Sequence, residues 1–294
     1  MGEFWDIALD VLLDAVEDTL YLVPFLFVTY LIMEWLEHKT GDKVQQAVRR
    51  AGAAGPAVGA VLGAVPQCGF SAVAATLYSG RVISLGTLFA VFLSTSDEML
   101  PVFIAQQVPI GTILGVLGAK IAIGMAMGFA IDAVMRLVRR SGDPLAIHDL
   151  CEQDGCHCHD EEGGGILKSA IIHTLQVTLF IFLVTLVLDA LIAVVGEDAI
   201  GGFLGGNEVL SVFASALVGL IPNCAASVVI AQLYLDGMLG SGALIAGLLV
   251  SSGVGLLVLL RSNRHVKQNA GIVAGLYATG VFWGLVVSAL GLTF

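Results

Sequence analysis

Two cysteines lie in nearly identical tripeptides, Pro66-Gln67-Cys68 and Pro222-Asn223-Cys224, deep inside uncharged stretches of the chain. The copies are 156 residues apart (222 − 66 = 156), and a serine follows each cysteine by three positions, Ser71 and Ser227. Thiolates favour soft or borderline ions such as zinc, copper(I) or trivalent arsenic, and the amide and hydroxyl groups could complete a ligand set. A lone cysteine in a membrane segment is ordinarily a small apolar side chain. Its recurrence beside a helix-breaking proline and an amide favours a substrate site.

A second polar cluster, Ser94-Thr95-Ser96-Asp97-Glu98, interrupts another long uncharged stretch. Thr95-Ser96 matches Ser251-Ser252 at the same offset of 156, so each half is expected to contain a helix that ends in a hydroxyl-rich break. Carboxylates in such a place cost roughly 2.5 kcal/mol or more each on insertion into lipid. Ser96, Asp97 and Glu98 are therefore predicted to bind the substrate or to carry protons. Lys120 and Asp132 in the following helix are their candidate partners, and Lys120 would compensate charge when the site is empty. The alternative interpretation places both carboxylates in a loop at the outer surface.

The first helix of each half carries further ionisable residues. Asp18 and Glu34 in the first half match His173 and Asp189 in the second. Glu34, His173 and Asp189 are candidates for coupling or charge compensation, with the histidine as a proton relay. The alternative for Glu34 and Asp18 is a position at a helix end, where a polar side chain reaches the membrane interface.

A polar segment between the halves is rich in soft metal ligands. Carboxylates accompany them, and Gly163-Gly164-Gly165 forms a flexible tether. The spacing is not that of a zinc finger, so the segment is predicted to hold an exchangeable soft metal on the cytoplasmic side. The alternative is a solvated acidic linker. The candidate ligands are His148, Cys151, Cys156, His157, Cys158 and His159.

Composition indicates the class of protein. Of 294 residues, 57% are hydrophobic and only 13% are charged, about half the charge of a soluble domain. Several uncharged runs, such as 51–80 and 237–260, exceed the ~20 residues that cross a bilayer as a helix. The sequence therefore predicts an all-α polytopic membrane protein. A net charge of −11 argues against nucleic acid as a partner, and the acidic N-terminus indicates an interfacial helix rather than a cleavable signal.

The duplication predicts two inverted repeats of about five helices each. Residues 1–138 form the first, with a broken or re-entrant hairpin at 51–80, residues 139–167 form the Cys/His-rich loop, and residues 168–294 form the second. Lysines and arginines follow the first helix of the first half but not that of the second. Because these residues mark cytoplasmic loops, the halves are expected to have opposite orientations, with hairpin tips meeting at the midplane. Both termini are then outside, in the inner membrane of a prokaryote.

The motifs resemble a known family, the ten-helix (10TM) heavy-metal exporters, also described as arsenic-efflux-like or manganese transporter permeases. The resemblance rests on residues 24–27, 33–34, 37–39, 66–71 and 93–101, and continues through the central loop to 222–224. It implies five helices in each half and metal efflux as the activity.

The predicted function is a secondary transporter that exports a transition or heavy metal by alternating access. The ligand set favours zinc- or manganese-like ions or an arsenical. No G-x-x-x-x-G-K-[ST] motif occurs, so coupling to protons is expected. The expected partners are the transported metal and membrane lipids. Neither a prosthetic group nor an enzymatic activity is expected. The sequence does not decide between a monomer and a homo-oligomer. The alternatives are transport of a sulfur- or arsenic-containing anion and a metal-sensing membrane protein.

Overall fold

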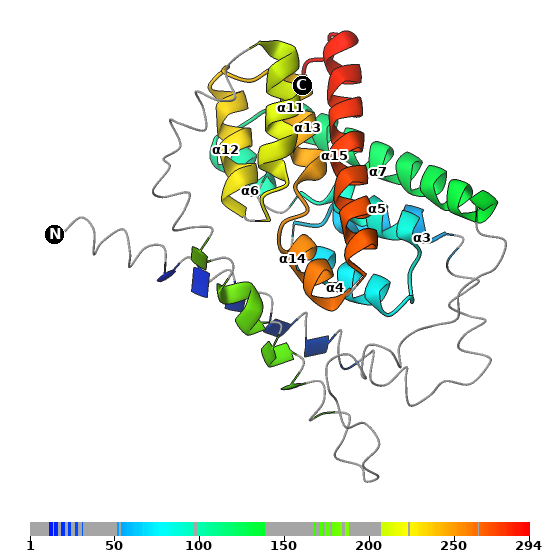
Figure 1. Cartoon of the computed structure of the whole chain (residues 1–294). Coiled ribbons are helices and arrows are strands. Elements are labelled where there is room, and N and C mark those ends of the chain that lie inside the picture. Colours follow the sequence, from blue (N-terminus) through cyan, green and yellow to red (C-terminus); the bar gives the residue numbers. More distant parts are fainter. Residues whose placement is uncertain are drawn as a thin grey trace.

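Every element in the described part of the chain is a helix (Figure 1). The computed structural model describes residues 54–66, 68–96, 99–138, 207–222, 224–263 and 265–294, with Gly52 and isolated residues in 12–31 and 167–187. The predicted domain boundaries and the whole Cys/His-rich loop lie outside these ranges.

The helices of the two halves correspond to one another at the offset of the two cysteine motifs. The first half comprises α3 (Gly55–Gly63), α4 (Cys68–Ser79), α5 (Leu85–Ser94), α6 (Met99–Ala105) and α7 (Ile110–Val138). The second comprises α11 (Glu208–Gly219), α12 (Cys224–Leu235), α13 (Ser241–Val250), α14 (Val254–Ser262) and α15 (Val266–Ala289). Adding 156 to the bounds of α4 and α5 gives those of α12 and α13. The predicted duplication is therefore present in the helices, and the opposite orientation of the halves stays a prediction.

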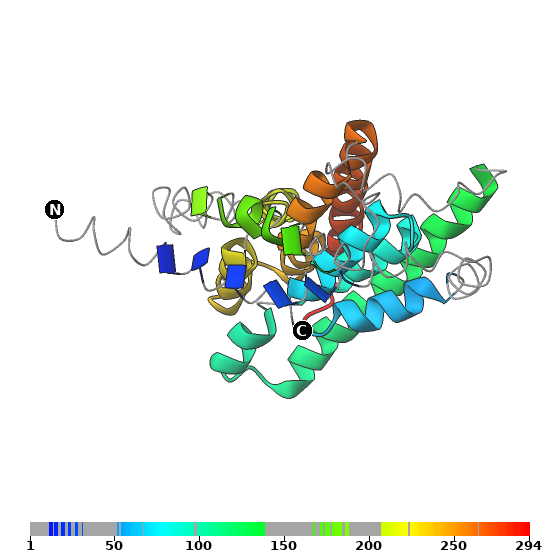
Figure 2. The same ribbon diagram turned by 90° about the horizontal axis from the view of Figure 1, so that it is seen from below.

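Each half contains a bundle of three helices. In the first, α5 packs between α3 and α7, and in the second α13 packs in the same way between α11 and α15 (Figures 1 and 2). Glycines bring the backbones together at equivalent points. A Cβ on Gly128 would lie 2.7 Å from the carbonyl oxygen of Gly86, and one on Gly284 would lie 2.7 Å from that of Gly242. Such close approach suits helix association in lipid, where van der Waals contact replaces the hydrophobic effect.

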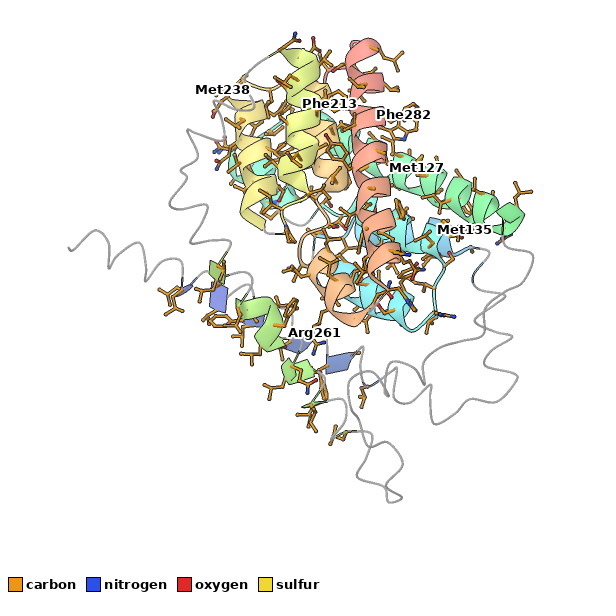
Figure 3. All side chains as sticks on the ribbon, in the orientation of Figure 1. Met127, Met135, Phe213, Met238, Arg261 and Phe282 are labelled. Atoms are coloured by element: carbon orange, nitrogen blue, oxygen red, sulfur yellow. The ribbon has the colours of Figure 1, made fainter. Side chains whose placement is uncertain are left out.

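Four described stretches are long and apolar enough to cross a membrane: Leu85–Ala105, Ile110–Leu137, Ser241–Ser262 and Val266–Ala289. Large apolar side chains such as Phe213 and Phe282 are exposed on the outside of the second bundle (Figure 3). In a multi-pass membrane protein these surfaces face lipid or other membrane segments.

The predicted hairpin at 51–80 consists of two short helices. With 9 residues in α3 and 12 in α4, they extend about 14 and 18 Å, less than the ~30 Å of hydrocarbon. Pro56 lies in the first turn of α3, where its missing N–H costs nothing. Pro66 follows the end of α3 and precedes the start of α4. The prediction of a broken hairpin is confirmed.

Candidate transport site

The chain breaks twice inside membrane-length apolar stretches. In the first half α5 ends at Ser94 and α6 begins at Met99; in the second, α13 ends at Val250 and α14 begins at Val254. The second break passes through Gly253, whose φ of 52° is a conformation that L-residues rarely adopt. Non-helical backbone at membrane depth is tolerated only where it is buried in protein or lines a cavity. The predicted hydroxyl-rich breaks are confirmed.

Each cysteine-bearing helix packs against the half-helix that follows the break of the other half. Helix α4 contacts α14, and α12 contacts α6 (Figure 1). The first turns of α4 and α14 touch: a Cβ on Gly255 would lie 2.7 Å from the Cβ of Ser71 and 2.9 Å from its carbonyl oxygen. Glycine is thus required at this crossing. The helix that begins at Cys68 therefore starts beside the break that contains Ser252.

Lys120 of α7 is buried where the two halves meet, with 1% of its side chain exposed. Its ammonium donates hydrogen bonds to the carbonyl oxygen of Thr95 and, at 2.8 Å, to that of Leu248. Thr95 is the C-cap of α5, and Leu248 lies in the last turn of α13. Carbonyls at helix C-terminal ends lack intrahelical partners and carry partial negative charge, so two such ends stabilise one buried cation. At the equivalent position of the second half stands Leu276, which is also buried.

The serines at the two breaks differ in their bonding. Ser96 Oγ donates to the carbonyl oxygen of Ala64 at 2.8 Å, which ties the break to the end of α3. Ser252, at the equivalent position, is equally buried, but its hydroxyl has no hydrogen-bond partner among the described residues. An unpartnered buried hydroxyl is unfavourable. The sequence analysis did not select Ser252 as a site residue, although it matches Ser96 at the repeat offset.

Asp132 lies away from the breaks. Its carboxylate accepts hydrogen bonds from Ser84 Oγ at 2.7 Å and from the backbone N–H of Gly86 at 2.9 Å. It therefore caps the start of α5, about 15 Å along this ten-residue helix from the break. The prediction that Asp132 pairs with the carboxylates after Ser96 is wrong, because its carboxylate is hydrogen-bonded at the opposite end of α5.

The other predicted site residues are placed only in part. Ser71 and Ser227 are buried in the first turns of α4 and α12. Cys68 and Cys224 begin these helices, and their side chains lie outside the described part of the structure. Within the described ranges, no three His, Cys, Asp or Glu side chains group together. The predicted ligands and coupling residues that fall outside these ranges are Glu34, Gln67, Asp97, Glu98, His148, Cys151, Cys156, His157, Cys158, His159, His173, Asp189 and Asn223.

Comparison with known proteins identifies the family. Curated proteins and solved structures gave no match. The model of a family described as "Putative, 10TM heavy-metal exporter" matches residues 7–198. The match covers the first half, the central loop and the start of the second half, which together are more than half of the chain. The chain therefore belongs to this family of ten-helix heavy-metal exporters.

Proposed function

We propose that the chain exports a heavy-metal species by alternating access through one site shared by the two breaks. The observation that carries the proposal is the ammonium of Lys120, which binds a carbonyl of each half at the place where α5 and α13 end. Discontinuous helices whose ends point at a central site are a recurrent solution for binding ions at the membrane midplane.

The cross-half packing supports a shared site rather than two separate ones. Cys68 begins a helix that packs on α14, and Cys224 begins a helix that packs on α6. Each break is thus framed by elements of both halves. Rocking of one half against the other would rearrange both breaks together, which is what alternating access requires.

The chemistry of the residues near the breaks favours a zinc- or manganese-like ion or an arsenical as cargo. Cys68 and Cys224 supply soft ligands, while Gln67, Asn223, Asp97 and Glu98 supply oxygens. With Lys120 as the buried cation at the ends of α5 and α13, a divalent ion would bind against a fixed positive charge unless the carboxylates are ionised. Proton binding to Asp97 or Glu98 would then weaken metal affinity, which gives a route to proton coupling.

A second candidate cargo is an arsenic- or sulfur-containing anion. The first turns of α4 and α14 touch at Ser71 and Gly255, and the free N–H groups of helix N-termini attract anions. The unpartnered Ser252 hydroxyl beside them could donate to an oxyanion, and Lys120 would balance its charge.

Flux into proteoliposomes tests the proposal and identifies the cargo. The full chain is reconstituted with a proton gradient, and uptake of zinc, manganese or arsenite is measured. The proposal expects flux of at least one of these species that is lost in Cys68→Ser and in Cys224→Ser. The matched control Cys158→Ser, in the central loop, should alter the affinity and leave the maximal rate. Flux that survives both core substitutions would refute the shared site.

A further inference from the structure

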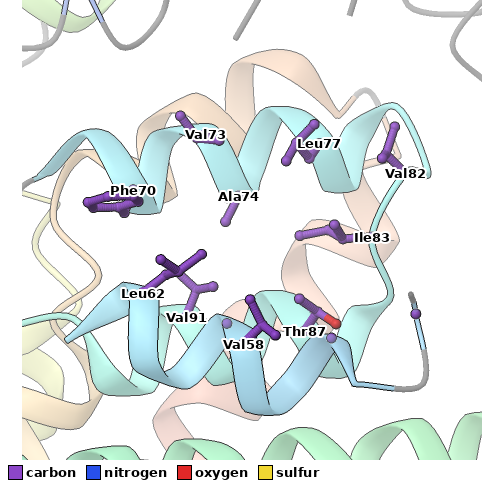
Figure 4. A pocket seen from close by; sticks show the side chains of 13 residues that line it. Val58, Leu62, Phe70, Val73, Ala74, Leu77, Val82, Ile83, Thr87 and Val91 are labelled. Atoms are coloured by element: carbon purple, nitrogen blue, oxygen red, sulfur yellow. The ribbon is translucent and has the colours of Figure 1, made fainter. Parts of the chain in front are cut away.

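A cavity of about 310 Å³ lies between α3, α4 and α5 of the first half (Figure 4). Its wall is apolar except for Thr87, and it includes Phe70, Ala74, Leu62 and Val58. Val58 and Leu62 are 55% and 43% exposed, so the cavity opens on the surface of the described part of the chain. Its volume is at the lower end of the ~300–1,000 Å³ of ligand pockets. An apolar cavity offers water no hydrogen-bond partners and stays dry.

The second half distributes its side chains differently at the equivalent positions. Ile230 stands where the first half has Ala74, and it is fully buried. Its Cδ1 lies only 2.7 Å from the point that a Cβ on Gly247 would occupy, so it packs tightly against α13. The first half has the reverse combination, with the small Ala74 opposite the larger Val91. The two copies of the fold therefore place their side-chain volume on different helices, on α5 in the first half and on α12 in the second.

The end of α4 carries a second difference. The N–H of Arg81 bonds to the Tyr78 carbonyl at 2.9 Å, and the N–H of Val82 bonds to that of Leu77 at 2.8 Å, which is a Schellman helix end. Arg81 has a φ of 54°, where glycine is usual. At the same point of the second half, α12 ends with the same hydrogen bonds around Gly237, whose φ is 75°. An arginine held in this conformation is strained, and such strain is typical of functional positions.

The two differences adjoin each other. Leu77 and Val82 of the helix end both line the cavity. In Figure 4 the lining side chains extend from Phe70 and Leu62 at one end to Val82 and Ile83 at the other. Arg81 immediately precedes Val82, so a basic residue stands next to that end of the apolar cavity. An apolar tail with an anionic head fits this arrangement.

We propose that the cavity holds one acyl chain of an anionic phospholipid, whose headgroup phosphate binds Arg81. The bilayer supplies acyl chains beside the exposed Val58 and Leu62 at the mouth. A chain that fills the cavity restores the dispersion contacts that an empty space lacks. The guanidinium has five N–H donors and binds phosphate in bidentate fashion, so a partner within the protein leaves donors for the lipid. The proposal does not depend on the transported species.

The repeat itself provides the test variants, Ala74→Ile after Ile230 and Arg81→Gly after Gly237. The purified full chain is mixed with vesicles of phosphatidylglycerol or of phosphatidylcholine and purified again, and bound lipid is counted by native mass spectrometry. Ala133→Ile and Arg136→Gln, both at exposed positions of α7, control for added volume and lost charge.

We expect wild-type chain to retain phosphatidylglycerol in preference to phosphatidylcholine. Ala74→Ile places a larger side chain in the space of the acyl chain. It should therefore raise the dissociation constant of both lipids, and lower their retention, by about tenfold. Arg81→Gly relieves backbone strain and should fold at least as well, while its preference for phosphatidylglycerol falls by about fivefold, the effect of one basic side chain beside an anionic surface. The controls should match wild type.

Three results would overturn the proposal. One is Ala74→Ile that folds and keeps its lipid. Another is Arg81→Gly with an unchanged preference for the anionic lipid. The third is wild-type chain that retains neither lipid, since another part of the chain would then occupy the cavity.

Discussion

The tight approach of α7 to α5 makes a sharp prediction for Gly128→Ala. A Cβ there would lie 2.7 Å from the Gly86 carbonyl oxygen and 2.9 Å from both the Ala90 and Pro56 Cβ atoms. All three contacts are too short for carbon, and one involves backbone that cannot rotate away. Overpacking of this kind costs about 1–3 kcal/mol, while replacing a helical glycine by alanine ordinarily gains about 0.5–1 kcal/mol.

Gly118 of the same helix is the matched control, because a Cβ there would meet nothing within 4 Å. Gly118→Ala should therefore be neutral or stabilising. Gly128→Ala should be less stable than Gly118→Ala by about 1–3 kcal/mol, because both variants share the gain in helix propensity and only the overpacking differs. Thermal unfolding of the detergent-solubilised chain, followed by tryptophan fluorescence, measures the difference. Equal midpoints for the two variants would contradict the packing of α7 on α5 described above.

Three further predictions concern buried polar groups. Lys120→Leu, which copies Leu276, should abolish flux. Its free energy of unfolding should fall by only about 0–3 kcal/mol, because the loss of two charge-assisted hydrogen bonds is offset by the removal of a buried charge. Normal flux in this variant would refute a role for Lys120 in transport. Ser96→Ala should lower stability by about 0.5–1.5 kcal/mol through loss of its bond to Ala64, whereas Ser252→Ala should be neutral in stability and reduce cargo affinity in the flux assay. Asp132→Asn should lower the free energy of unfolding by about 0.5–2 kcal/mol, because it weakens the cap at the start of α5. Ser288→Ala should leave it unchanged, because the hydroxyl at this equivalent position has no partner among the described residues. Equal losses for the two variants in urea titrations would contradict the cap.

The duplicated motifs allowed much of the fold to be predicted. Pro66 and Pro222 mark where a helix must stop, and the helices that follow begin at Cys68 and Cys224 as the offset requires. The breaks after Ser94 and Val250 were also predicted, because the hydroxyl pairs Thr95-Ser96 and Ser251-Ser252 recur at the same offset within apolar runs.

The partners of the site residues could not be predicted in this way. Lys120 binds carbonyl oxygens of Thr95 and Leu248, and backbone acceptors leave no mark on the sequence. The packing of α4 on α14 depends on how the halves dock, which periodicity within one half does not specify. Asp132 was misassigned because distance along the chain hides that α7 runs back past the start of α5, where Ser84 and the Gly86 N–H recruit the carboxylate.

Metal stoichiometry tests most directly whether the two halves share one site. In a chain whose six candidate loop ligands are replaced by serine, elemental analysis after equilibration with zinc should find one bound ion. These ligands are His148, Cys151, Cys156, His157, Cys158 and His159. Adding either Cys68→Ser or Cys224→Ser should remove that same ion, so that each variant binds none. Two ions in the parent chain, with one lost in each variant, would show separate sites and contradict the account.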